Sequence, residues 1–187
     1  ISWFAHKNQV MDRMRDGIAG LMKKYKVEVA FGKATLSTGP AVTVDGETHE
    51  ADNVLVCTGS SPAKPPIPGI DADHVVDSSG ILELPELPKK LVIVGGGVIG
   101  CEFACVFGSV GVPVTVIEAL PEICPGVDPE VAAVLRKELE KKNITFQLGA
   151  KVDEIGEKEV KVSLNGETQS VPGDVVLVAT GRKPNVS

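Results

Sequence analysis

Hydrophobic and polar residues recur with two different periods along the chain, and these periods predict its elements. Between residues 2 and 25, apolar side chains recur at steps of three and four, which predicts a helix. Residues 27–37 alternate with a period of two and predict a strand. Residues 41–59 predict a hairpin that turns at an Asp-Gly pair and leads into a buried strand. Four prolines in residues 61–71 predict an extended connector, because proline continues neither a helix nor a ladder.

After Pro88 the pattern changes to alternating strands and helices. Residues 89–97 read KKLVIVGGG and predict a buried strand that ends at glycines. A helix is predicted from Val98 to about Ser109, and a second strand over 112–119.

A second helix is predicted to begin at Asp128 and Pro129, an N-cap followed by a proline at the first helical position, and to end near residue 143. We expect its apolar face to hold Val131, Val134, Leu135 and Leu139. Three further strand-like runs follow, at residues 144–157, 159–167 and 174–182. The order strand–helix–strand–helix–strand predicts an α/β fold, a Rossmann-like three-layer domain with a β-meander.

Two segments of the chain have similar sequences. VLVCTGSSP at 54–62 and VLVATGRKP at 176–184 are both apolar strands that end in a Thr-Gly turn. We therefore predict the later part of one nucleotide-binding domain over residues 1–85 and a second such domain over 86–187. The chain begins with isoleucine and stops just after a strand-like run, so we expect it to be an internal piece of a longer protein.

The spacing of Gly95, Gly97 and Gly100 fits G-x-G-x-x-G at the junction of a strand and a helix. The first glycine allows a sharp turn, the second lets backbone approach a pyrophosphate, and the third lets the helix lie close to the sheet. The pyrophosphate would meet free N–H groups at the positive end of the helix dipole. The plainer alternative is a tight turn that binds nothing.

Glu118 supports the binding interpretation. It lies 23 positions after Gly95 at the end of the next strand, close to the ~20 residues expected of a carboxylate that accepts from ribose hydroxyls. A carboxylate there repels a 2′-phosphate, and residues 119–122 hold no arginine, so the sequence predicts NAD rather than NADP. The alternative is a solvated acid at a strand end.

Other reactive side chains give weaker signals. Cys101 and Cys105 share a helix face but are about 6 Å apart there, too far for a disulfide, so we expect small packed cysteines. We give the same interpretation to Cys57 and Cys124. The three histidines are scattered, and no metal site is predicted. Glu102, expected in the first helical turn, is equally consistent with a helix-stabilising acid and with a group near a bound nucleotide.

Charge and composition narrow the class of protein. The net charge is −6 without a basic stripe, which argues against a nucleic-acid partner. No apolar run approaches the ~18 residues of a membrane span. Four cysteines without C-x-x-C spacing suit a reducing compartment. The predicted location is the cytoplasm, and an organelle matrix is the alternative.

Several motifs together resemble one enzyme family. They are GGGVIGCE at 95–102, IEA at 117–119, the turns CTGSSP and ATGRKPN, and the prolines that lead to an Ile-Pro-Gly at 67–69. The chain resembles the flavin-dependent pyridine nucleotide–disulfide oxidoreductases, and within them the dihydrolipoamide dehydrogenase group.

The resemblance implies that residues 1–85 form the later part of an FAD-binding domain and that residues 86–187 form the NAD-binding domain. The implied FAD contacts are Gly32, Thr58, Gly59 and Ser60. The implied NAD contacts are Gly95, Gly96, Gly97, Val98, Ile99, Gly100, Cys101, Glu102, Glu118, Val152 and Gly181.

The resemblance also implies a reaction, in which electrons pass from dihydrolipoamide through a disulfide and a flavin to NAD⁺. The sequence holds no C-x-x-x-x-C pair, no FAD fingerprint and no C-terminal His-Glu pair, so we expect this chain alone to bind NAD(H) without catalysing the reaction. A homodimer, and a 2-oxo acid dehydrogenase complex as partner, are implied for the full protein. The alternatives are a related NADH oxidase, mercuric reductase or soluble transhydrogenase, or a non-catalytic NAD-binding module.

Overall fold

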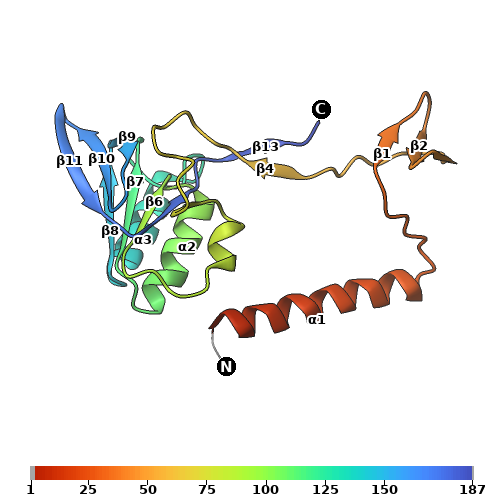
Figure 1. Cartoon of the computed structure of the whole chain (residues 1–187), viewed down its shortest axis with the longest axis horizontal. Coiled ribbons are helices and arrows are strands. Elements are labelled where there is room, and N and C mark those ends of the chain that lie inside the picture. Colours follow the sequence, from red (N-terminus) through yellow and green to blue (C-terminus); the bar gives the residue numbers. More distant parts are fainter. Residues whose placement is uncertain (1–2, 187) are drawn as a thin grey trace. The chain divides into compact units, whose positions relative to one another are not determined.

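The computed structural model describes residues 3–186, and their contacts divide the chain into two compact units (Figure 1). Unit 1 covers residues 1–58 and unit 2 covers residues 59–187. Unit 1 contains α1 (Trp3–Lys24), β1 (Ala34–Leu36), β2 (Ala41–Val44) and β3 (Glu47–Glu50). Unit 2 contains β4 (Ser60–Pro62), β5 (Val75–Val76), the 3₁₀ helix η1 (Gly80–Glu83), β6 (Leu91–Val94), α2 (Val98–Ser109), β7 (Val114–Glu118), α3 (Pro129–Glu140), β8 (Ile144–Leu148), β9 (Lys151–Ile155), β10 (Glu159–Leu164), β11 (Glu167–Pro172), β12 (Val175–Val178) and β13 (Arg182–Pro184).

Unit 1 consists of a helix and a small antiparallel sheet. Helix α1 confirms the helix predicted from residues 2–25. The sheet has the order β1-β2-β3, and the predicted hairpin is formed by β2 and β3. Asp45 and Gly46 connect them with positive φ values of 47° and 95°, the backbone that a tight two-residue hairpin turn requires.

Two strand predictions in unit 1 are wrong. Only Ala34–Leu36 of residues 27–37 forms a strand. The buried strand predicted at 54–57 does not form, and Leu55 is 87% exposed. An apolar run is buried as a strand only when neighbouring strands and covering layers are present. Among the described residues of unit 1, no strand pairs with this run.

Unit 2 is built around a parallel sheet. Its five strands have the order β5-β12-β6-β7-β8, and each neighbouring pair is parallel. The chain runs β6-α2-β7-α3-β8, as predicted, and then forms the antiparallel meander β9-β10-β11. The single run predicted over 144–157 forms two strands, because the chain turns at Gly149 with a φ of 67°. The α/β fold with a meander is confirmed.

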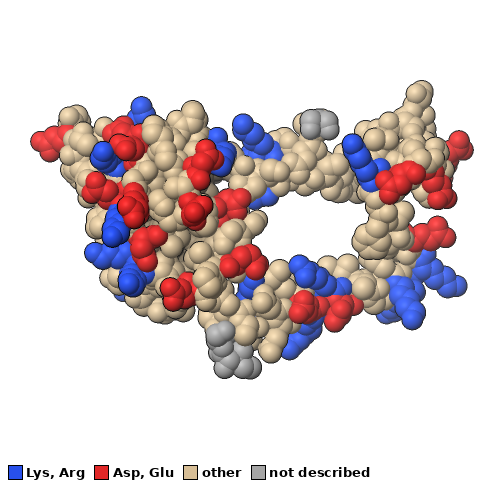
Figure 2. All heavy atoms as spheres, in the orientation of Figure 1, with Lys and Arg blue, Asp and Glu red and all other residues tan. Residues whose placement is uncertain are grey.

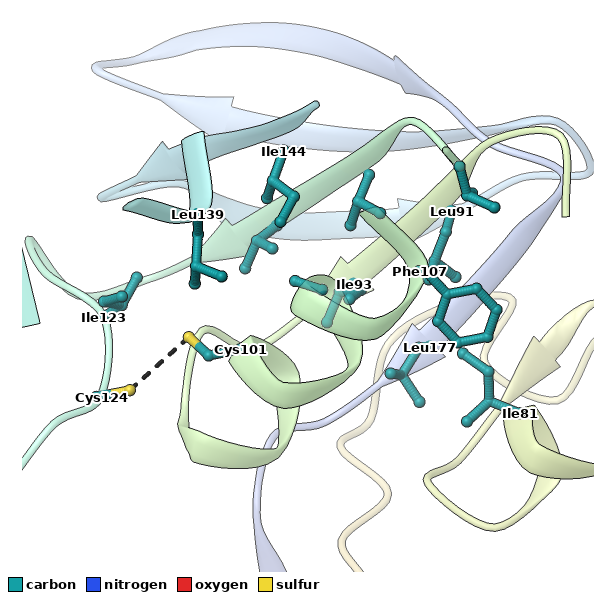
Figure 3. Close-up of a cluster of buried hydrophobic side chains, with 14 of the residues drawn as sticks. Ile81, Leu91, Ile93, Cys101, Phe107, Ile123, Cys124, Leu139, Ile144 and Leu177 are labelled. Atoms are coloured by element: carbon teal, nitrogen blue, oxygen red, sulfur yellow. Dashed lines mark hydrogen bonds between the residues drawn. The ribbon is translucent and has the colours of Figure 1, made fainter. Parts of the chain in front are cut away.

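The parallel sheet lies between two layers. Leu91 and Ile93 of β6 are buried on the face that packs against α2 and α3, where Phe107 is fully buried (Figure 3). Val92 and Val94 are buried on the opposite face, against the meander. Both faces of a parallel strand are buried in this arrangement, which explains why β6 reads as an unbroken apolar run.

The second predicted helix begins as expected, but its buried face differs from the prediction. The Asp128 side chain accepts hydrogen bonds from the N–H groups of Glu130 at 2.9 Å and Val131 at 3.4 Å, so it is the N-cap of α3. Ala132 and Leu139 are buried, whereas three of the predicted apolar positions are exposed. They are Val131, Val134 and Leu135. The small Ala132 belongs to the helix-side core, whereas these wider side chains do not.

Residues 59–85 belong to unit 2, which differs from the boundary expected at residue 85. β4 pairs with β13 and β5 pairs with β12, and Ile81 of η1 is fully buried in the helix-side core. The predicted proline-rich connector is extended only in part, because residues 68–71 form a turn. Residues 61 and 62 are extended but pair with β13, although no ladder was expected in this segment. Long-range pairing places this segment with the second unit.

On the face shown in Figure 2, positive and negative side chains are mixed: lysine and arginine are interspersed with aspartate and glutamate. None of the helices described between residues 3 and 186 combines the length and the apolar character that a bilayer span requires.

Candidate functional site

A cavity of about 870 Å³ lies in unit 2 at the carboxyl ends of β6, β7 and β12. β6 is the first strand of the β6-β7-β8 series, and β12 pairs with it on the other side, so the cavity lies at a point where the strand order reverses. The lining residues are Pro65, Pro66, Ile67, Pro68, Val94, Gly95, Gly97, Val98, Ile99, Ile117, Glu118, Ala119, Leu120, Pro125, Ala150, Lys151, Val152, Asp153, Ala179, Thr180 and Gly181.

The first glycine of the motif turns the chain out of β6. Gly95 has a φ of 108°, which side chains rarely adopt, and its N–H donates to Ile117 O at 2.8 Å. A Cβ at Gly95 would lie 2.6 Å from Ala179 O. The turn therefore requires glycine, both for its backbone angle and for the close approach of the loop after β12.

The second glycine faces the cavity. A Cβ at Gly97 would meet no atom within 4 Å, and its φ of −70° and ψ of −175° are open to any residue. The helical hydrogen bonds of α2 begin with the Cys101 N–H and Gly97 O. The preceding N–H groups, from Val98 to Gly100, thus have no acceptor within the helix. This is the geometry of an anion site at a helix N-terminus.

The remaining two glycines pack inward. A Cβ at Gly100 would lie 2.0 Å from Gly95 O and 3.3 Å from the Ile93 side chain, so the absence of a side chain lets α2 approach β6. A Cβ at Gly96 would lie 3.1 Å from Glu118 Cβ. Neither glycine lines the cavity, and both hold its walls in place.

Glu118 is buried at the end of β7, only 8% exposed, and it lines the cavity. Its Oε2 accepts from the Gly96 N–H at 2.6 Å, and its Oε1 accepts from the Leu120 N–H at 2.8 Å. The carboxylate therefore ties the glycine-rich turn to the end of β7. Each carboxylate oxygen has a second lone pair, so the group can also accept from a ligand hydroxyl.

Most of the other candidate residues lie at the cavity, and two do not. Val98, Ile99, Val152 and Gly181 line it, whereas Cys101 and Glu102 are not among its lining residues. The Cys101 side chain is buried in the core beneath α2. Glu102 is exposed and lies just beyond the first turn of the helix, which corrects the expected first-turn position.

One wall of the cavity is formed by residues that follow β7 and is anchored by an ion pair. Arg136 of α3 donates from Nε to Glu122 Oε1 at 3.0 Å and from Nη1 to Glu140 Oε1 at 3.0 Å. The hydrogen bond from Arg136 holds the pKa of Glu122 below its ordinary value of 4.5. Leu120 and Pro125, on either side of Glu122, line the cavity.

We expect Glu122→Gln to lower the free energy of unfolding by about 1 kcal/mol at pH 7, the upper range for a partly exposed ion pair. A carboxylate with a depressed pKa stabilises the fold above its unfolded pKa and loses this effect as pH falls through its folded pKa. Urea titrations should therefore show a smaller difference from the parent at pH 3 than at pH 7. Glu138→Gln, in an exposed pair with Lys141, is the control with the smaller effect. Equal losses at both pH values would contradict the ion-pair explanation.

The sequence interpretation missed two groups of cavity residues. Lys151 and Asp153 line the cavity from β9. Pro65 to Pro68 line it from the connector, which is held to β9 by the Ile155 N–H donating to Pro68 O at 2.8 Å. Ala179 and Thr180 follow the carboxyl end of a parallel strand. They could have been predicted from the rule that ligands of such sheets bind at the carboxyl ends of the strands. Nothing in the proline pattern indicated a cavity wall.

The residues implied in FAD binding fall in both units. Gly32 and Thr58 belong to unit 1, and Gly59 and Ser60 belong to unit 2. A Cβ at Gly32 would lie 2.3 Å from Asp45 Oδ2, so the local packing explains this glycine. Ser60 Oγ accepts from Arg182 Nε at 2.7 Å, across the β4–β13 pair. The FAD contacts remain a prediction from the resemblance.

The chain was compared with known families and structures. The pyridine nucleotide-disulphide oxidoreductase family matches it over residues 3–187. The chain belongs to this family. Family members are oxidoreductases that use FAD and NAD(P). The parallel sheet and the glycine-rich turn described above are consistent with the nucleotide-binding fold of this family.

Relatives within the pyridine nucleotide-disulphide oxidoreductase family include two dihydrolipoyl dehydrogenases. One, from Acholeplasma laidlawii, is 37% identical over 97% of this chain and 55% of its own length. Dihydrolipoyl dehydrogenase 3 of Pseudomonas aeruginosa is 39% identical over 95% of this chain and 40% of its own length. The structure of the HOCl-induced flavoprotein disulfide reductase RclA from Escherichia coli matches with a TM-score of 0.80 and 31% identity, over 98% of this chain and 43% of that protein. The chain spans about half or less of these proteins.

Proposed function

We propose that unit 2 is the NAD(H)-binding module of a flavin-dependent disulfide oxidoreductase. The observation that carries the proposal is the open space at Gly97, next to the N–H groups that begin α2. A pyrophosphate fits this place because no side chain fills it and because the helix N-terminus favours an anion. The buried carboxylate of Glu118 lies on the adjoining strand, at the same cavity.

Different residues of the chain would bind different parts of the nucleotide. The N–H groups at the start of α2 would bind the pyrophosphate, and Glu118 would accept from the adenosine ribose hydroxyls. Val152 and the connector residue Ile67 offer apolar cavity walls, which shield a bound ring from water. Bound NAD⁺ would supply the hydride acceptor, while the protein supplies orientation.

For the full protein we propose the reaction of dihydrolipoamide with NAD⁺ to give lipoamide and NADH. The names of its relatives support this choice. FAD, a homodimer and a 2-oxo acid dehydrogenase complex are proposed with it. The present chain contains no C-x-x-x-x-C pair, so we propose that it binds NAD(H) without turning over lipoamide.

The first test is the choice between the two pyridine nucleotides. We expect NADH to bind about tenfold more tightly than NADPH, because a 2′-phosphate would lie against the Glu118 carboxylate (a factor of ten is about 1.4 kcal/mol). The cation of Lys151 lines the same cavity and should keep the difference from being larger. Fluorescence titration of the purified chain with each nucleotide measures both affinities.

Two variants separate the contributions of these charges. Glu118→Gln removes the negative charge and should bring the two affinities closer together. Lys151→Ala should weaken NADPH more than NADH. If the unchanged protein bound NADH and NADPH equally, Glu118 would not select between them. If it bound neither nucleotide, unit 2 would not be an NAD(H)-binding module.

A further inference from the structure

Two thiols outside the proposed binding site lie in contact beneath the glycine-rich turn. Cys101 belongs to α2, and Cys124 belongs to the segment between β7 and α3. Their Sγ atoms are 3.7 Å apart, and the two side chains point toward each other in Figure 3. Cys101 is 5% exposed and Cys124 is 4% exposed, and both are free thiols.

Both cysteines donate hydrogen bonds to the same carbonyl group, that of Gly96 in the turn. The Cys101 thiol donates to Gly96 O at 3.4 Å, and the Cys124 backbone N–H donates to the same oxygen at 2.8 Å. The N–H of Gly96 donates to Glu118. Pro125 follows Cys124 and lines the cavity. The two cysteines are thus linked to the turn by hydrogen bonds and to a wall of the cavity through Pro125.

The backbone at Cys124 is strained. Its φ of 51° lies in the left-handed region, which a residue with a side chain adopts at a cost of about 1–3 kcal/mol. It lies in a segment outside any helix or strand. A disulfide has an S–S length of about 2.05 Å, so bond formation requires the sulfurs to approach by about 1.6 Å. Movement of the Cys124 segment toward α2 by this amount would bring the sulfurs to bonding distance.

We propose that Cys101 and Cys124 form a redox modification site, at which a small hydroperoxide closes an intramolecular disulfide that weakens NAD(H) binding at the adjoining turn. In the first step the Cys124 sulfur attacks the peroxide, the O–O bond breaks, and a sulfenic acid and an alcohol or water form. In the second step the Cys101 sulfur attacks the sulfenic sulfur, the S–O bond breaks, and water leaves with the Cys101 proton. The two thiols lose two electrons in total, and the peroxide gains them.

The surroundings of Cys101 make this reaction slow at neutral pH. Burial is the main cause that raises the pKa of Cys101 to about 12, together with the charge and hydrogen bond of Cys124 and the negative charges of Glu118 and Glu102. The thiolate is the reactive form, and its fraction rises about tenfold for each pH unit below the pKa. The disulfide should therefore form faster at pH 9 than at pH 7.

The test uses the chain with Cys57→Ser and Cys105→Ser, which leaves only the two cysteines of the pair. After treatment with hydrogen peroxide at pH 7 and pH 9, intact mass and peptide mapping report the bond. We expect a mass lower by two hydrogens and a peptide that links residues 101 and 124. We further expect NADH affinity to fall by at least about tenfold, or about 1.4 kcal/mol, because the bond would displace the turn that precedes α2. Dithiothreitol should restore it.

Variants distinguish the possible outcomes. Cys124→Ser, added to the same background, should abolish both the mass change and the peroxide effect on NADH. A protein in which no 101–124 bond forms, while the Cys residues are oxidised singly, would overturn the proposal, as would a bond that leaves NADH affinity unchanged. The effect on NADH rests on the proposed function, but bond formation does not. Failure of the reduced protein to bind NADH would count against the proposed function, and the mass measurement would still test the disulfide.

Discussion

Replacement of Gly97 with valine is expected to lower the affinity for NADH by at least about a hundredfold, or about 2.7 kcal/mol. The isopropyl group would extend into the space where the pyrophosphate is proposed to bind. The backbone at Gly97 accepts valine without strain, because its φ is −70°. The fold should therefore be retained, and circular dichroism together with NADH titration measures both properties.

Gly17→Val is the matched control for this experiment. Gly17 lies in α1 of unit 1, and a Cβ there also meets nothing within 4 Å. It should leave NADH affinity unchanged. An unchanged affinity in the Gly97 variant would show that the nucleotide does not bind at this turn, and the proposed module would lose its main support.

Replacement of Gly100 with alanine should instead destabilise unit 2 by at least about 1–3 kcal/mol, the usual cost of overpacking. The added Cβ would lie 2.0 Å from Gly95 O, a backbone atom that moves only with the turn itself. Hydrogen exchange of the unit 2 amides measures this loss in the free energy of unfolding.

Gly97→Ala provides the comparison, because it adds the same methyl group three residues earlier in open space. It should change stability by less than about 0.5 kcal/mol, as surface substitutions usually do. If the two alanine variants were equally stable, the close approach of α2 to β6 would not depend on the third glycine.

The parts of unit 2 that could be predicted are those in which local sequence and tertiary structure agree. The apolar strand before Gly95 ends at a turn that only glycine accommodates, and Asp128 begins a helix by a hydrogen bond to its own first turn. Glu118 was identified because the length of a strand–helix–strand unit fixes how far away the second strand ends. Each of these signals is contained in a short stretch of sequence.

The parts that could not be predicted depend on contacts between distant segments. Residues 55–57 of the apolar run are exposed because, among the described residues, no strand pairs with them, which their own sequence does not reveal. The face of α3 was misplaced because alanine gives a weak signal of burial, and Ala132 is the residue that faces the sheet. Cys101 and Cys124 were interpreted separately, and their contact depends on the path of the segment after β7.

The pairing of β4 with β13 has a consequence for how this module could be rearranged. Ser60 and Pro184 are partners in the ladder, although 124 residues separate them. Two points near the ends of the described part of unit 2 are thus a single strand spacing apart. Such a module can be transplanted as a cassette into a surface loop of another protein, or have its ends joined and reopened elsewhere, with little cost in loop closure.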